Sequence, residues 1–124
     1  MQKAVADPNR RTPPSRAGAR AFRWSRVTAV CLILLLPYGL YVLASVAGKD
    51  LIAIRQVFAL PFNALAMLAL VGIGAWHMRL GMREILEDYA RGSTLGALLV
   101  ANTLFCLAIV LTAGGAVVKL WLGA

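Results

Sequence analysis

The chain has 124 residues, of which 60% are hydrophobic, and its mean hydropathy is +0.76. A soluble domain of this length needs far more polar surface, so the composition excludes that class and predicts a membrane protein with one domain. The net charge is +8, and seven of the thirteen Lys and Arg residues lie in the first 26 positions without a nucleic-acid recognition motif. We therefore expect this basic stretch to contact acidic lipid head groups and not nucleic acid.

Residues 1–22 are rich in arginine and proline and have almost no apolar content. Such a segment cannot build a core, so we expect a flexible tail. Phe22, Trp24 and Arg26 follow at the edge of the first apolar run, where aromatic and arginine side chains fix the depth of a helix in the membrane. Residues 23–124 are then predicted to form the membrane domain.

Three apolar runs, at about 27–47, 58–80 and 95–118, are each long enough for a helix to cross the roughly 30 Å of bilayer hydrocarbon. Pro37 predicts a kink or a packing contact within the first run, because it removes a backbone hydrogen bond. A loop is predicted between the first two runs, and Pro61 suits the first turn of the second helix. The predicted fold class is an all-α membrane protein of three transmembrane helices that pack into a heteromeric helical bundle.

The second helix is predicted to continue beyond the membrane surface, because no helix breaker follows Gly81 until Gly92. Arg83 and Glu87 are spaced four residues apart and should pair along it. We expect this helix to stop at Gly92 or Ser93, and we expect the same serine or the neighbouring threonine to cap the third helix.

The distribution of basic residues predicts the orientation. The N-terminal tail and the loop between the second and third spans together carry ten Lys and Arg residues. The first loop and the C-terminus together carry three. By the positive-inside rule the N-terminus and the 77–89 end are cytoplasmic, and the C-terminus is periplasmic.

The stretch from Trp76 to Tyr89 carries the candidate functional residues. At 100° per residue, His77, Gly81 and Asp88 share one helix face, with His77 and Asp88 about 16 Å apart along the axis. Gly81 offers a flat notch that a large planar group or another backbone could approach.

His77 is the single histidine of the chain, and two interpretations are open. It caps a helix contact among the head groups, or it is a ligand or proton-relay group, since ionisable side chains inside spans are costly and mark function. Neutral imidazole is a common axial ligand of haem iron. If His77 binds a haem held by two histidines, the second histidine must come from another polypeptide.

Asp88, Tyr89 and Arg26 also have two interpretations each. They are ordinary interfacial residues, or they form a quinone site in which a phenol donates a hydrogen bond to a carbonyl oxygen and a carboxylate relays protons. Arg26 lies at the same membrane face and could pair with a haem propionate or an acidic group.

The sequence contains no motif of a soluble enzyme, such as a nucleophile elbow, a glycine-rich phosphate loop or a Cys/His metal spacing. Cys31 and Cys106 lie in apolar runs and are interpreted as small buried residues. No covalent catalysis by this chain alone is expected.

The pattern His77-x(3)-Gly81-x(3)-Ile85-Leu86-x-Asp88-Tyr89, at the inner end of the second of three spans, resembles the hydrophobic membrane-anchor family of succinate dehydrogenase, respiratory complex II. The run from Trp24 to Ala29, W-S-R-V-T-A, is similar to the start of the first span in that family. The resemblance extends from about Trp24 to the end of the chain.

The resemblance implies a non-catalytic anchor within a succinate:quinone oxidoreductase, which passes electrons from succinate to quinone. A second membrane anchor would share a haem b and supply its other histidine, and the iron-sulfur and flavoprotein subunits would dock on the cytoplasmic side. Carried over to this sequence, His77 would be an axial haem ligand and Gly81 and Arg26 would lie near the haem. Tyr89 and Asp88 would belong to the ubiquinone pocket.

The same resemblance, with the tail uncleaved, favours a bacterial inner membrane over a mitochondrial one. Two alternatives remain open at this point. One is a small cofactor-free helical protein that acts in membrane interaction or assembly. The other is a proton- or ion-conducting subunit, for which the spans offer few ionisable groups.

Overall fold

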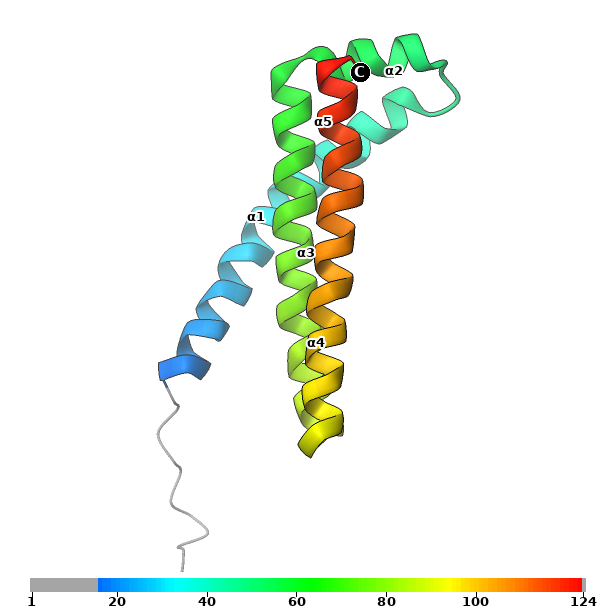
Figure 1. Ribbon diagram of the computed structural model, residues 1–124. Helices are drawn as coiled ribbons and strands as arrows, with labels where there is room; N and C mark the ends of the chain where they lie inside the picture. The colour runs from blue at the N-terminus through cyan, green and yellow to red at the C-terminus, as the bar shows by residue number, and fades with distance from the viewer. Residues whose placement is uncertain (1–15, 124) are drawn as a thin grey trace, which may run out of the picture.

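The computed structural model describes residues 16–123 and is helical almost throughout (Figure 1). Three of its helices are long and apolar enough to cross a membrane, at Gly18–Val46, Pro61–Tyr89 and Gly92–Leu122. The prediction of an all-helical protein with three helices long and apolar enough to cross a membrane is confirmed, whereas the heteromeric packing stays a prediction. The elements in chain order are α1 (Arg16–Val46), α2 (Leu51–Ala59), α3 (Pro61–Tyr89), α4 (Gly92–Ile109), the π-helical turn η1 (Val110–Gly114) and α5 (Gly115–Leu122).

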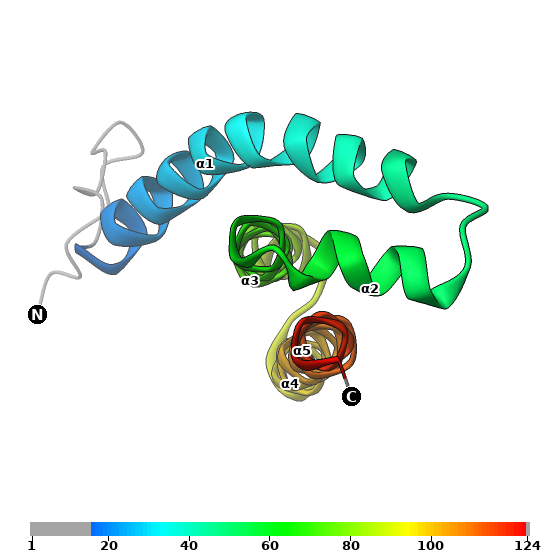
Figure 2. The same ribbon diagram turned by 90° about the horizontal axis from the view of Figure 1, so that it is seen from above.

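The first helix begins earlier than the first predicted span. α1 starts at Arg16, within the stretch 1–22 that was expected to be a flexible tail, and residues 1–15 of that stretch lie outside the described residues. Pro37 lies inside α1, and the helix bows along its length when seen from above (Figure 2).

α3 is the central helix of the molecule. It packs against α1 on one side and against α4, η1 and α5 on the other, as the view from above shows (Figure 2). α4, η1 and α5 follow one another as a single continuous span beside α3 (Figure 1). Within the described residues α1 does not contact α4, and the two sides are linked through α3 and, at the end that holds α5, through α2.

Residues 51–59 form the short helix α2, so the prediction of a loop up to the second span is wrong. Gly48 ends the preceding turn with a φ of +72°, a conformation that glycine adopts without steric cost. Asp50 then caps α2, because its side chain accepts a hydrogen bond from the Ala53 amide at 3.0 Å. Leu60 is extended, and Pro61 lies in the first turn of α3, as predicted.

The α3–α4 connection also differs from the prediction. α3 ends at Tyr89, and the Ala90 amide donates to the Leu86 carbonyl at 2.9 Å. Ala90 and Arg91 are extended, and α4 begins at Gly92 with a φ of +65°. The helix therefore ends earlier than expected. Arg91 occupies the N-cap position without a side-chain hydrogen bond, so the predicted serine or threonine cap is wrong.

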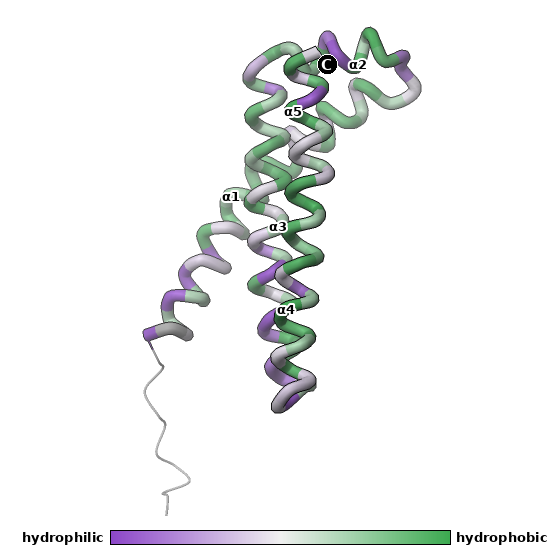
Figure 3. Tube along the Cα trace, viewed as in Figure 1, coloured by the Kyte–Doolittle hydropathy of each residue, from purple (hydrophilic) through white to green (hydrophobic). Residues whose placement is uncertain are grey.

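The buried core lies at the end of the bundle that holds α2 and α5. Tyr38 of α1 donates a hydrogen bond to the Asn63 side-chain oxygen, and the Asn63 amide donates to the Val57 carbonyl at 2.9 Å, which ties α1, α2 and α3 together. Hydrophobic residues run along the length of the long helices (Figure 3), and many of the large ones outside this core are exposed. The core comprises Val42, Phe58, Ala64, Met67 and Val117.

Candidate functional site

His77 lies in the C-terminal half of α3 and contacts α1. Its Nδ1 atom is 2.9 Å from the hydroxyl oxygen of Thr28, a residue of α1 that is 49 positions earlier in the chain. The rings of Trp24 and Trp76 pack beside this contact with their centroids 5.9 Å apart. The lone imidazole is therefore fixed at the α1–α3 crossing by a side-chain hydrogen bond and an aromatic pair.

Thr28 is a residue whose role the sequence did not reveal. It is the one buried polar side chain in the described part of the chain, with 7% of its surface exposed. Its hydroxyl oxygen also lies 2.8 Å from the Trp24 carbonyl oxygen and 3.0 Å from that of Ser25. The sequence signal was a threonine in an otherwise apolar run. Its partner His77 could not be predicted, because the pairing depends on how α1 and α3 cross.

An apolar groove of about 380 Å³ adjoins this contact. One turn beyond His77, a Cβ atom added to Gly81 would meet no atom within 4 Å, so the chain leaves the expected notch open. The groove offers an apolar surface beside Thr28, and Gly81, which does not line the groove, leaves room for a ligand to approach the backbone of α3. The groove is lined by Trp24, Thr28, Ala69, Gly72, Ile73 and Trp76.

The residues predicted for a quinone site lie at the end of α3. Tyr89 is the last residue of the helix and is 87% exposed, and Asp88 beside it is exposed as well. Tyr89 is twelve residues beyond His77, about 18 Å along the helix axis. The structure therefore places His77 and Gly81 on the same helix as Asp88 and Tyr89, with the two pairs separated along the helix axis.

Arg26 belongs to the first turns of α1 and is exposed. Its guanidinium carbon lies 4.9 Å from the centre of the Phe22 ring, a cation–π contact within the same helix. No ion pair joins Arg26 to Asp88 within the described residues. The lower part of α1 diverges from α3 towards this end (Figure 1).

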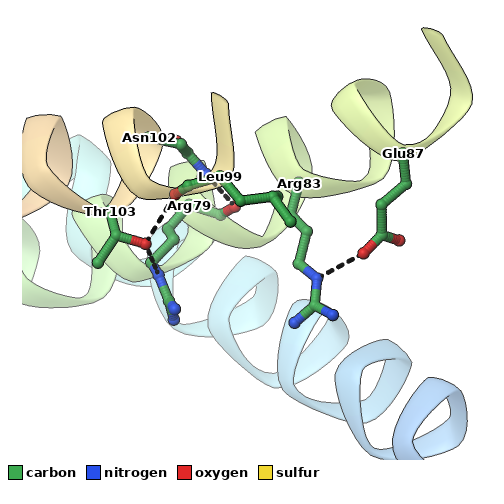
Figure 4. Close-up of polar contacts among 6 residues, drawn as sticks. All are labelled: Arg79, Arg83, Glu87, Leu99, Asn102 and Thr103. Atoms are coloured by element: carbon green, nitrogen blue, oxygen red, sulfur yellow. Dashed lines mark hydrogen bonds and ion pairs between the residues drawn. The ribbon is translucent and has the colours of Figure 1, made fainter. Parts of the chain in front are cut away.

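Polar side chains join α4 to the C-terminal half of α3, the half that contains His77 (Figure 4). Arg79 donates through Nε to the Thr103 hydroxyl at 3.1 Å, and the Asn102 amide donates to the Arg79 carbonyl at 3.0 Å. Arg83 and Glu87 form the predicted ion pair at 2.7 Å. The asparagine and threonine were missed from sequence, although polar side chains inside a span commonly join helices in this way.

The described residues hold no group of three or more His, Cys, Asp or Glu side chains that could bind a metal ion. His77 is thus a single potential ligand, and its Nε2 atom makes no hydrogen bond to any described residue. One imidazole beside an apolar groove is a donor set that fits a haem shared with another chain, and it does not fit a self-contained metal site.

A family model described as the succinate dehydrogenase/fumarate reductase transmembrane subunit matches residues 6–116, which is most of the chain. The chain belongs to this family. The match covers α1, α2, α3 and α4 in full, so it includes every candidate residue of both sites.

The chain is similar to two bacterial proteins named succinate dehydrogenase hydrophobic membrane anchor subunit. The one from Rickettsia typhi is 32% identical over 106 residues, which cover 85% of each chain. The one from Paracoccus denitrificans is 32% identical over 98 residues, which cover 79% of this chain and 76% of the relative. No solved structure matches. The resemblance to the succinate dehydrogenase membrane-anchor family is confirmed.

Proposed function

We propose that this member of the family is the hydrophobic membrane anchor of a bacterial succinate dehydrogenase in which His77 supplies one axial ligand to a haem b. The observation that carries the proposal is the fixed position of His77, which the Thr28 hydroxyl holds beside an apolar groove. A second membrane anchor supplies the other histidine, because this chain contains only one.

A haem bound there would supply one-electron redox chemistry. The chain's own residues orient that group: His77 sets the position of the iron, and the open space at Gly81 admits the ring. Arg26 is exposed on α1, two residues before Thr28. It is the residue of this chain that would pair with a haem propionate.

The second part of the proposal is that Tyr89 and Asp88 form part of the ubiquinone pocket. Tyr89 donates a hydrogen bond to a quinone carbonyl oxygen, and Asp88 takes part in the proton path. Both side chains are exposed at the end of α3, where the iron-sulfur and flavoprotein subunits would dock and complete the pocket.

The proposed orientation, in a bacterial inner membrane, has the N-terminus and the end of α3 in the cytoplasm and the C-terminus in the periplasm. The geometry supports it: the start of α1 and the end of α3 lie toward one end of the bundle, and the C-terminus lies at the other (Figure 1). Arg79, Arg83 and Arg91 belong to the first of these ends, which carries the excess of basic residues.

The test is a reduced-minus-oxidised absorption spectrum of the complex purified with its partner subunits. The wild type should show a b-type band, and His77→Ala should lose or shift it while the subunits remain associated. Gln56→Ala, an exposed polar position on α2, is the control and should keep the wild-type spectrum. A band that is unchanged in His77→Ala contradicts the ligand assignment and favours the cofactor-free alternative.

A further inference from the structure

We propose that Thr28 is a positioning residue that holds His77 in one tautomer, with the proton on Nδ1 and the lone pair on Nε2. This inference rests on the proposed haem function and deepens it. It assigns a role to a residue of the first helix, which touches the haem ligand and need not touch the haem.

The proton count at the Thr28 oxygen decides the direction of the hydrogen bond. A threonine hydroxyl has one proton, and three acceptor-capable atoms surround it: the Trp24 and Ser25 carbonyl oxygens and the His77 Nδ1. A carbonyl oxygen cannot donate, so the two carbonyl contacts are favourable only if the hydroxyl proton points toward them.

The imidazole must then donate to the hydroxyl. With the Thr28 proton directed to the Trp24 carbonyl at 2.8 Å, the 2.9 Å contact to His77 is a hydrogen bond only if Nδ1 carries a proton. The opposite arrangement leaves two oxygen atoms within 3.0 Å of the Thr28 oxygen with no proton between them. In the neutral imidazole, Nε2 is therefore unprotonated and able to bind a metal.

Burial makes this arrangement energetically significant. Thr28 is 7% exposed, so a hydroxyl or an Nδ1 proton left without a partner there would lose its hydrogen bond without gaining one to water. The hydrogen bond also restricts rotation of the imidazole ring. By accepting a hydrogen bond from Nδ1–H, Thr28 would increase the electron density on an imidazole that binds haem iron through Nε2, which would favour the oxidised iron and lower the haem midpoint potential.

The experiment compares three variants of the whole complex. Thr28→Val keeps the shape of the side chain and removes the hydroxyl, whereas Thr28→Ser keeps the hydroxyl. Thr112→Val is the matched control, because the Thr112 hydroxyl makes the same type of contact to the carbonyls of Ala108 and Ile109, at 2.7 and 3.3 Å, and does not touch His77.

The readouts are the haem content per complex and the haem midpoint potential from an optical redox titration. We expect Thr28→Val to bind haem about tenfold more weakly and to show a more positive midpoint. Thr28→Ser and Thr112→Val should match the wild type in both measurements.

The outcomes separate this inference from the function on which it rests. A wild-type complex without haem overturns the proposed function and this inference with it. A wild-type complex with haem, together with an intact Thr28→Val complex of unchanged haem content and midpoint, overturns the role of Thr28 alone. Equal changes of haem content and midpoint potential in Thr112→Val also overturn it. The effect would then come from the loss of an intrahelical threonine hydrogen bond and not from the contact with His77. If Thr28→Val does not assemble, a shifted midpoint in Thr28→Ser decides against the inference.

Discussion

His77 and Tyr89, the two residues on which the proposed function depends most, differ in exposure and in hydrogen bonding. His77 is held by Thr28 at a helix crossing, whereas Tyr89 is 87% exposed at the end of α3. A tyrosine side chain so exposed at a helix end has a phenol that is free to donate to an incoming ligand. In the proposed complex the position of this phenol depends on the neighbouring subunits.

Replacing Tyr89 by phenylalanine removes one hydrogen-bond donor and little else. We expect quinone reduction by the complex to fall about fivefold, the equivalent of ~1 kcal/mol for one hydrogen bond. Succinate oxidation with an artificial electron acceptor should stay at the wild-type rate. Tyr41→Phe is the matched control. Tyr41 is also exposed, but it lies near the C-terminal end of α1, away from Tyr89. Equal loss of both activities in Tyr89→Phe would show that the residue serves assembly instead.

At the scale of the elements, the crossing of α1 and α3 determines where Thr28 meets His77. Gly39 of α1 is buried at this packing surface, and a Cβ atom there would clash with the Leu70 side chain of α3. Because Leu70 is flexible, an alanine at this position can be accommodated by a change of its rotamer. A larger branched side chain would push the two helices apart.

Gly39→Val is therefore expected to lower the haem content of the complex although Gly39 is about three turns from Thr28. Gly39→Ala should have a smaller effect. Gly115→Val is the control, since a Cβ atom at Gly115 meets nothing within 4 Å. Haem content and thermal stability of the purified complex are the measurements, and wild-type values in Gly39→Val would show that the crossing tolerates wider spacing.

The sequence predicted the features that depend on local patterns. The three apolar runs, the position of Pro61 in the first turn of α3 and the Arg83–Glu87 pair follow from composition and spacing, and the structure confirms them. α2 was missed because a capped nine-residue helix is too short to stand out from a loop by periodicity. Thr28 was missed because its partner is 49 residues away, and such a pairing depends on how the helices cross.

At the scale of the whole molecule, the two halves of the bundle are packed differently. The buried core and the Tyr38–Asn63 contact lie toward the end that carries α2 and α5. The half that contains His77 has few buried side chains, and large apolar residues such as Trp24 and Trp76 are about half exposed there. Surfaces of this size and polarity are covered by lipid or by other membrane helices. In the proposed complex, helices of partner subunits would cover this half of the bundle and complete both sites.

The central claim is that this chain contributes part of a haem site and part of a quinone site to a larger complex. The most direct test is to purify the complex from its native membrane through a tag on this chain and to identify the bound chains by mass spectrometry. We expect a flavoprotein, an iron-sulfur protein and a second membrane anchor, with succinate:quinone reductase activity and one b-type haem. Recovery of this chain without a succinate-oxidising subunit would contradict the central claim.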